Sequence, residues 1–333
     1  MTKPNLHPTR RAALGMVGAA LALPLALPLA LPRALAAGTG DSLTGRAFGT
    51  SWQIVGPPRA ALEQLAPDID ALFAEVDTQM SPWRADSTIS RFNAMPSGWY
   101  AADAETRLVT TRALALARDS DGAFDPTVGP LVAQWGFGPI SGSNRPDWRG
   151  LTLDAEAIGK ARDGLTLDLC GIAKGRALDR AVDLVRAAGL DNLLFDLGGE
   201  FKALGRHPSG REWHVAVQHP QVGQAPPAVL RMTPDTAVAT SGLRTQSYVL
   251  ADQTYGHIIN PATGTPADAG LMSVSVVAND AMTADGWATA LFAAGPETGV
   301  TLAQDHRIAA LFLVRDGATI RQIKTGAMDT MLL

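Results

Sequence analysis

Cysteine is nearly absent from this sequence, since Cys170 is the only one in 333 residues. A single cysteine excludes an intrachain disulfide, a Cys-x-x-Cys redox motif and a zinc site built on several thiolates. Cys170 lies next to a predicted turn, and because free thiols are usually buried we expect this one to be buried. Residues 1–36 contain no cysteine, so we also expect no lipid anchor on an N-terminal cysteine.

The chain also lacks a basic stripe, a long run of like charge and a repeat of solenoid length. It has 28 basic and 32 acidic residues, a balance that offers nucleic acid no extended basic surface. The motifs GxxxxGK(S/T), HExxH and GxSxG are missing as well. We therefore expect no nucleic-acid partner and no active site built on these motifs.

Residues 1–36 have the pattern of an export signal. Arg10 and Arg11 precede a long apolar stretch, and Ala34-Leu35-Ala36 offers small residues for cleavage before Ala37. Paired arginines are typical of the twin-arginine route, so we expect a soluble, acidic protein in the periplasm. The alternative is a retained membrane anchor, but repeated Leu-Pro steps make this stretch a poor membrane helix.

The remaining residues, 41–333, contain no evident linker and are predicted to form one unit of the α+β class. Helical spacing of apolar residues predicts helices over 58–79, 103–119, 173–188, 281–294 and 296–305. Alternating patterns predict strands over 42–55, 165–169, 193–197, 213–218, 228–233, 236–240, 246–251 and 271–278, and a closing hairpin over 308–323. Polar loops are predicted over 80–93 and 121–130, and antiparallel pairing should be prominent.

The stretch 165–202 places polar residues at the joints of a predicted strand–turn–helix–strand unit. Asp168 precedes the turn at Gly171, Lys174 opens the helix, and Gly189 ends it as a C-cap glycine would. A turn that leads into a helix N-terminus exposes backbone N–H groups and favours phosphate. The alternative is an ordinary strand–helix–strand unit whose charges are solvated.

Two other stretches contain candidate chemistry. Asp285 and Thr289 are four residues apart, which places two hard oxygen ligands suited to Mg²⁺ on one helical face. The alternative is that polar residues at 279–283 cap this helix and that Thr289 only packs. His257 follows a predicted strand, where it could act as a general base or as a hydrogen-bonded structural residue.

Together these stretches resemble the ApbE family of FAD:protein FMN transferases over nearly all of 45–315. Seven motifs in the same order carry the resemblance: FGT at 48–50, MSPWRADSTISRFN at 80–93, GAFDPTVGPLVAQWGFG at 122–138, DLCGIAKG at 168–175, FDLGGE at 195–200, YGHIINPATGTP at 255–266 and TADGWATALF at 283–292. Phe48 replaces the usual methionine and Trp83 the usual tyrosine, while Ala288 stands where some members have a polar side chain.

The resemblance implies mixed, largely antiparallel sheets with packed helices, forming an ApbE-like catalytic domain over 41–333. It also implies that FAD and Mg²⁺ bind, and that FMN passes from FAD to a threonine hydroxyl of another protein while AMP leaves. The acceptor would be an exported flavin-carrying subunit with a Ser/Thr-Gly-Ala-Thr-like motif.

The same resemblance assigns roles to individual residues. His257 would take the proton of the threonine, and Asp285, Thr289 and the backbone carbonyl of Gly171 would hold the metal. The residues that would line the cofactor site are Phe48, Trp83, Ala123, Phe124, Asp125, Asp168, Lys174 and Ile259.

Two other functions stay open from the sequence. One is a periplasmic FAD-binding carrier, which the Asp285 and Thr289 pair argues against because a carrier needs no metal. The other is a Mg²⁺-dependent FAD pyrophosphatase that gives FMN and AMP, which would use the same metal site with water as nucleophile. In each case we expect membrane association only through an acceptor or an uncleaved signal.

The export signal gives the first testable prediction. A double Arg10→Lys, Arg11→Lys variant should accumulate as precursor in the cytoplasm, because the twin-arginine route depends on the arginine pair. Cell fractionation and N-terminal sequencing would check this, with a wild-type mature chain expected to begin near Ala37. Normal export of the double variant would exclude the twin-arginine route.

Overall fold

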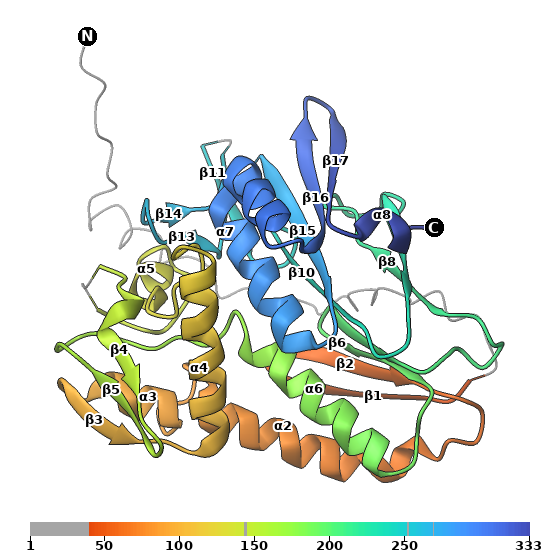
Figure 1. Cartoon of the computed structure of the whole chain (residues 1–333), viewed down its shortest axis with the longest axis horizontal. Helices are drawn as coiled ribbons and strands as arrows, with labels where there is room; N and C mark the ends of the chain where they lie inside the picture. Colours follow the sequence, from red (N-terminus) through yellow and green to blue (C-terminus); the bar gives the residue numbers. More distant parts are fainter. Residues whose placement is uncertain (1–39, 143–144, 252, 269) are drawn as a thin grey trace, which may run out of the picture. The chain divides into compact units, whose positions relative to one another are not determined.

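Figure 1 shows the computed structural model of the chain, which describes residues 40–142, 145–251, 253–268 and 270–333. All of them belong to one unit, and the predicted export signal lies outside the described residues. No helix within these ranges combines the length and the apolar character needed to cross a membrane.

An eight-stranded sheet forms the centre of this unit. Its strands lie in the order β1-β2-β6-β7-β10-β15-β16-β17, and every neighbouring pair is antiparallel. The strands are β1 (Ser42–Ala47), β2 (Thr50–Val55), β6 (Leu193–Leu197), β7 (Glu200–Leu204), β10 (Ala237–Gly242), β15 (Leu271–Ala278), β16 (Ala309–Asp316) and β17 (Thr319–Thr325). The predicted α+β class with prominent antiparallel pairing is confirmed.

Smaller sheets and the helices surround the central sheet. The small sheets pair β3 (Gly98–Ala101), β5 (Ala157–Lys160) and β4 (Leu151–Leu153); β8 (Trp213–Val217) and β9 (Ala228–Met232); β11 (Ser247–Leu250) and β12 (Gln253–Gly256); and β13 (Ile259–Asn260) and β14 (Thr265–Pro266). The helices are α2 (Ala66–Met80), α3 (Thr88–Ala94), α4 (Ala104–Asp119), α5 (Gly129–Gln134), α6 (Ala173–Ala187), α7 (Ala281–Asp305) and α8 (Met328–Met331), with 3-10 turns η1 (Leu62–Leu65) and η2 (Trp148–Gly150).

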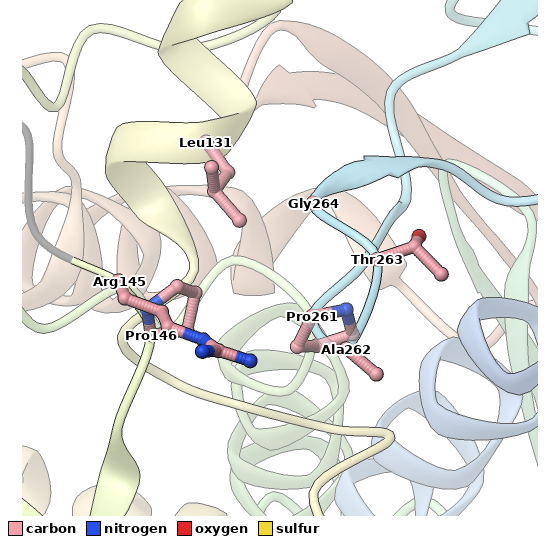
Figure 2. A pocket seen from close by; sticks show the side chains of 7 residues that line it. All are labelled: Leu131, Arg145, Pro146, Pro261, Ala262, Thr263 and Gly264. Carbon is pink, nitrogen blue, oxygen red and sulfur yellow. The ribbon is translucent and has the colours of Figure 1, made fainter.

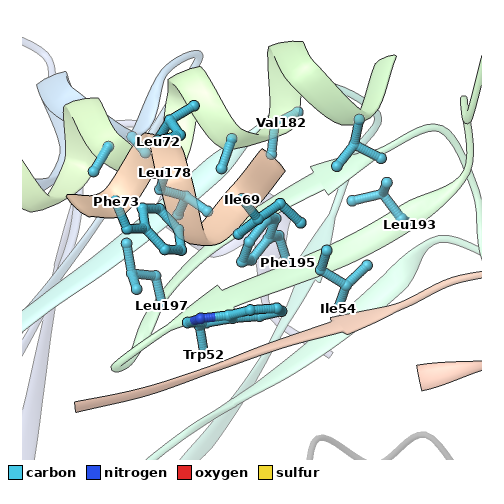
Figure 3. Close-up of a cluster of buried hydrophobic side chains, with 14 of the residues drawn as sticks. Trp52, Ile54, Ile69, Leu72, Phe73, Leu178, Val182, Leu193, Phe195 and Leu197 are labelled. Carbon is cyan, nitrogen blue, oxygen red and sulfur yellow. The ribbon is translucent and has the colours of Figure 1, made fainter. Parts of the chain in front are cut away.

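Both faces of the central sheet are buried, and the strand alternation shows how. In β6, Leu193 and Phe195 join a core cluster with α2 and α6, whereas Leu194 joins a cluster with β8, β9 and α8. Figure 3 shows the first cluster, where Trp52 from β2 and Phe195 pack beneath Phe73 of α2. Period-two burial of this kind fixes the register, because a slip of one residue would exchange the faces.

Most predicted elements are present, with differences at their ends. Helix α6 ends as predicted: Gly189 has φ +85°, its N–H donates to Arg186 O at 2.9 Å, and Leu190 N–H donates to Val185 O at 3.3 Å. This is the Schellman pattern that glycine favours. The two helices predicted over 281–305 are continuous in α7 except for a break at Gly295, whose φ is +83°.

Three local predictions were wrong. Residues 165–169 join no sheet, although their leucines are buried, so the alternation reflects burial of an extended segment. The predicted loop at 80–93 contains helix α3, which Ser87 caps by accepting a hydrogen bond from Ser90 N–H. The single strand predicted over 42–55 is a hairpin, because Phe48 and Gly49 both have positive φ and reverse the chain.

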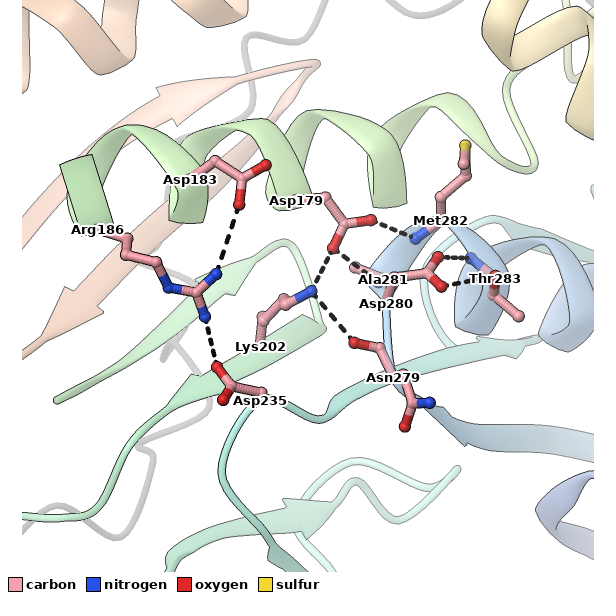
Figure 4. A network of polar contacts seen from close by, with 10 residues as sticks. All are labelled: Asp179, Asp183, Arg186, Lys202, Asp235, Asn279, Asp280, Ala281, Met282 and Thr283. Carbon is pink, nitrogen blue, oxygen red and sulfur yellow. Dashed lines mark hydrogen bonds and ion pairs between the residues drawn. The ribbon is translucent and has the colours of Figure 1, made fainter. Parts of the chain in front are cut away.

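The start of α7 is held to the middle of α6, as Figure 4 shows. The carboxylate of Asp179 on α6 accepts hydrogen bonds from the N–H groups of Ala281 and Met282 at 2.9 and 3.0 Å. Lys202 donates to the same carboxylate at 2.7 Å. A Cβ atom on Gly175 would lie 2.2 Å from the carbonyl oxygen of Ala281, so only glycine permits this approach. The predicted site residues on both helices are brought together by this contact.

Candidate functional site

The centre of the candidate site lies where Gly171, just before α6, touches Thr289 on α7. A Cβ atom on Gly171 would be 2.9 Å from Thr289 Cγ2, 3.1 Å from its Oγ1 and 3.2 Å from Phe124 Cε2. Glycine is required there because no other residue leaves room for these neighbours. Three residues predicted from separate motifs are therefore in one place.

Asp285 lies one helical turn before Thr289 and is 5% exposed. Its Oδ2 accepts a hydrogen bond from Gly175 N–H at 2.9 Å. Burial raises the pKa of this carboxyl, while the nearby Lys174 charge and the Gly175 hydrogen bond oppose the rise. A buried carboxylate is stabilised in its ionised form by a cation beside it. The charge of Lys174 alone does not offset the effect of burial on Asp285.

The donor set of this centre fits Mg²⁺. A carboxylate, a hydroxyl and a backbone carbonyl are hard oxygen ligands, and Mg²⁺ usually keeps several waters besides a few protein ligands. Within the described ranges there is no group of three or more His, Cys, Asp or Glu side chains that could hold a metal. The site thus suits a cation that needs one carboxylate, and it does not suit a zinc site built on several side chains.

Lys174 forms an ion pair with Glu200 that the sequence analysis did not single out. Its Nζ is 2.6 Å from Glu200 Oε2, and the glutamate side chain is 4% exposed. Burial raises the pKa of Glu200 to about 8 and that of Asp196 to about 6, although the charge of Lys174 opposes both shifts. Burial alone would lower the pKa of Lys174, but the charges of Glu200 and Asp285 raise it. The lysine is therefore charged and surrounded by carboxyl groups.

Asp125 and Asp168 shape the loop beside this centre. Asp125 is 7% exposed; its Oδ1 accepts from Thr127 N–H and Oγ1 at 2.8 and 2.6 Å, and its Oδ2 from Trp148 N–H at 3.3 Å. Asp168 Oδ1 accepts from Cys170 N–H at 3.0 Å, while its own N–H donates to Pro126 O at 2.7 Å. The backbone N–H of Asp168 thus joins the segment before α6 to the 121–130 loop, and the side chain of Asp125 joins the same loop to Trp148.

His257 lies between β12 and β13 and is half-buried. Its Nδ1 is 3.1 Å from Gln246 O, and because a carbonyl only accepts, Nδ1 carries the proton and Nε2 keeps a free lone pair. Burial lowers the pKa of the imidazole, the Lys174 charge adds to this, and the Gln246 hydrogen bond opposes it. The ring is therefore neutral at neutral pH and able to accept a proton at Nε2.

The other residues predicted to line the cofactor site differ in how deeply they are buried. Phe124 and Ile259 are buried and Ala123 is half-buried. Phe48, in the β1–β2 turn, is half-buried, and its ring meets the Phe73 ring edge-on at 5.4 Å. Trp83 is 68% exposed, so its indole is not packed into the cluster.

The prediction of a buried Cys170 was wrong, because its thiol is exposed. In the extended segment Leu165, Leu167 and Leu169 are buried, and the next residue faces the opposite side. Cys170 is the first residue of the turn that follows this segment, and it is exposed there. Besides Glu200, Ser241 on β10 is a site residue that the sequence analysis did not predict. Its hydroxyl is 3.4 Å from that of Thr289.

A pocket of about 310 Å³ opens beside the turn that follows β13, as Figure 2 shows. It is lined by Leu131, Arg145, Pro146 and residues 261–264. Trp135 Nε1 donates to Gly264 O at 2.9 Å and fixes one wall. No sequence pattern predicted this pocket, because its walls come from α5, the 138–150 loop and a turn far along the chain.

Comparisons with known proteins identify the family of the chain. Residues 48–312 match the model of the ApbE family. The chain is 35% identical over 310 residues to the FAD:protein FMN transferase of Vibrio cholerae serotype O1, covering 87% of this chain and 92% of that protein. Among solved structures it is similar to the flavin transferase ApbE from Vibrio cholerae, with TM-score 0.78 and 32% identity over 88% of this chain and 100% of that one. The apo flavinyl transferase ApbE of Pseudomonas stutzeri gives TM-score 0.78 and 32% identity over 88% and 96%.

The contact between Gly171 and Thr289 can be tested by packing. Gly171→Ala should lower the free energy of unfolding by about 1–3 kcal/mol, because its Cβ would overlap Thr289 Cγ2. Adding Thr289→Ser removes that methyl group, keeps the hydroxyl and should recover part of the loss. Urea unfolding of the wild type, both single variants and the double variant would measure the coupling. Strictly additive losses would show that the two residues are not in contact.

Proposed function

The chain belongs to the ApbE family of flavin transferases, and on this premise we propose that it is a Mg²⁺-dependent FAD:protein FMN transferase with a threonine acceptor. It would transfer FMN from FAD to the hydroxyl of another, exported protein and release AMP. The observation that carries the proposal is the meeting of Gly171, Asp285 and Thr289 beside Lys174 and the start of α6. The backbone N–H groups of the turn and of the helix N-terminus, together with the positive charge of Lys174, suit the binding of a pyrophosphate group.

The proposed step is a phosphoryl transfer. The threonine Oγ attacks the phosphorus of the FMN half of FAD, forming a new P–O bond. The bond from that phosphorus to the bridging oxygen of the pyrophosphate breaks, and this oxygen leaves with AMP. The threonine proton passes to His257 Nε2, which the Gln246 hydrogen bond leaves free.

The residues of this chain divide the remaining work. Asp285, Thr289 and the Gly171 carbonyl would hold Mg²⁺, which when bound supplies positive charge to the pyrophosphate. Lys174 adds a second positive charge, held in place by Glu200. Phe124 and Ile259 offer apolar walls for flat rings, and Phe48, Trp83, Ala123, Asp125 and Asp168 remain proposed contacts of FAD.

Two alternatives use the same site. A FAD carrier would not need the oxygen set at Asp285 and Thr289. A Mg²⁺-dependent FAD pyrophosphatase would need it, with water in place of the threonine hydroxyl, and would give free FMN and AMP. Incubation with FAD, Mg²⁺ and a protein that contains one Ser-Gly-Ala-Thr segment separates the three, because only a transferase makes that protein fluorescent on a denaturing gel.

The acceptor should be another chain. The nearest match to the acceptor motif within this sequence is Thr325-Gly326-Ala327-Met328, which ends in methionine. Thr325 itself is 5% exposed, and its hydroxyl donates to Ile308 O at 2.8 Å. Intact-mass spectrometry after incubation with FAD and Mg²⁺ should therefore find no added mass on this chain, and one FMN ester on the supplied acceptor. A stable FMN adduct on this chain would refute the prediction.

Asp285 tests the metal assignment. Asp285→Asn keeps the size of the side chain and an oxygen that accepts the hydrogen bond from Gly175 N–H, but it removes the negative charge. The rate of FMN transfer should therefore fall at least about a hundred-fold. Calorimetric binding of Mg²⁺ in the presence of FAD should weaken in parallel, and Thr289→Ala should have the smaller effect on transfer. Asp305→Asn, at the exposed end of the same helix, is the matched control. Wild-type Mg²⁺ affinity in Asp285→Asn would reject the assignment.

His257 predicts a pH dependence. The base must be unprotonated, and its pKa is lowered from 6.5, so kcat/KM should be full above the lowered value and fall as the pH drops through it. The acidic limb should thus lie below pH 6.5 and disappear in His257→Ala. That variant should lose roughly 10²–10⁴-fold in transfer and keep its FAD affinity. Loss of FAD binding in this variant would instead make His257 a cofactor-binding residue.

A further inference from the structure

We infer that the outer edge of β11 is the docking site of the acceptor polypeptide, which pairs along Ser247–Leu250 as an extended segment and so brings its threonine to His257. We call Ser247–Leu250 the docking edge. The inference rests on the proposed function, because it supposes an acceptor that must reach His257. Its partner is of one kind: an extended, uncharged stretch of another protein.

The docking edge is unusually apolar for an exposed strand. Tyr248, Val249 and Leu250 are consecutive, and they are 39%, 69% and 53% exposed. Within the described ranges β11 pairs only with β12, so one side of the strand has no neighbour in a sheet. A free edge presents unpaired backbone N–H and C=O groups, which are a template for another strand.

Several other edges of this protein are protected in the ways that proteins commonly use, whereas β3 (Gly98–Ala101) and β12 (Gln253–Gly256), like β11, contain neither a charge nor a proline. The two outer strands of the central sheet contain basic residues, Arg46 in β1 and Arg321 and Lys324 in β17. Strand β14 contains Pro266, which cannot donate a backbone hydrogen bond. The docking edge has neither a charge nor a proline. An exposed apolar edge without these devices favours pairing with a partner strand.

The hairpin is held in position by stacked aromatic rings. Tyr248 and Tyr255 are partners across the two strands, and their rings stack at 5.5 Å. Trp135 stacks on Tyr255 at 5.5 Å, and Phe137 stacks on Tyr248 at 5.3 Å. Rings packed in this way anchor one face of the hairpin on the segment after α5, so its edge is presented in a fixed orientation.

The docking edge is continuous with the proposed base. Gln246, the residue before β11, accepts the hydrogen bonds from the N–H and the Nδ1 of His257. Phe137 also meets the His257 ring edge-on at 6.3 Å. A segment paired with Val249 needs about three residues, at about 3.3 Å each, to reach the level of Gln246. Because His257 lies on the β12 side of Gln246, the segment must then pass the start of β11 to reach the imidazole. In the proposed reaction the acceptor polypeptide must reach His257, and the docking edge begins one residue after Gln246, which contacts His257.

The uncharged edge also matches its proposed partner. A Ser/Thr-Gly-Ala-Thr segment has small, neutral side chains, so it can lie against Tyr248, Val249 and Leu250 without burying a charge. A second copy of this chain is the competing occupant. It would place β11 against β11, and it would then block the access of an acceptor to His257.

The test changes the edge while leaving the site untouched. Val249→Asp and Val249→Lys should each raise the KM for a soluble protein with a single Ser-Gly-Ala-Thr segment about ten-fold or more, with FAD affinity unchanged. The control is Leu108→Asp, because Leu108 is an apolar residue on α4 that is 39% exposed. The inference would be overturned if only one of the two Val249 substitutions raised the KM, or if the control variant raised it equally.

Hydrogen exchange tests the pairing itself. With FAD present and an acceptor whose threonine is replaced by alanine, the amides of Ser247 and Val249, which point away from β12, should become protected in the wild type and not in Val249→Asp. Unchanged exchange there, while the wild type still flavinylates the normal acceptor, would overturn the docking edge and leave the proposed function intact. A concentration-dependent dimer of this chain that Val249→Asp dissociates would assign the edge to a second copy. No transfer to any such acceptor by the wild type would overturn both proposals.

Discussion

The hydrogen bonds from the start of α7 to Asp179 of α6 are the constraint on which the candidate site depends. The first N–H groups of a helix have no partner within it, and here Asp179 accepts two of them, from Ala281 and Met282. Its negative charge also matches the positive end of the α7 dipole. The carboxylate belongs to α6, so the hydrogen bonds that satisfy the first N–H groups of α7 also fix the two helices to each other. The absence of a side chain at Gly175 lets their backbones touch.

This clamp explains why charges accumulate at the site. Once the helices are fixed, Asp285 is buried against the start of α6, and Lys174 is directed toward Glu200 on β7. Burying Asp285, Glu200 and Asp196 around one lysine is unfavourable, as the raised pKa values of all three carboxyl groups indicate. The proposed Mg²⁺ at Asp285 and Thr289 would offset part of this cost.

The sequence predicted the helices well where a local signal existed, and its predictions failed where tertiary contacts decide the structure. Gly189 ended α6 as predicted because its left-handed conformation is a local requirement. The motifs also located Gly171 and Thr289, although periodicity could not show that residues so far apart in the chain would touch. The alternating leucines at 165–169 predicted burial correctly and a strand wrongly, since pairing depends on a neighbour that the pattern does not specify. Glu200 lay within a recognised motif, but nothing local indicated that it would pair with Lys174. Ser241 had no signal beyond its place in a strand.

The proposed base His257 and the proposed metal ligand Thr289 lie on different elements, yet a shared core fixes their relative positions. Ile258, next to His257, is buried in the same cluster as Ala288, the residue before Thr289. Because neighbouring residues of an extended segment face opposite sides, burying Ile258 directs His257 away from that core, where Gln246 orients its ring. The core thus fixes His257 relative to Thr289, while the stacked aromatics fix the hairpin relative to His257. Reacting groups need positioning to within a fraction of an ångström. Apolar packing supplies this positioning here, because no hydrogen bond joins His257 to α7 within the described residues.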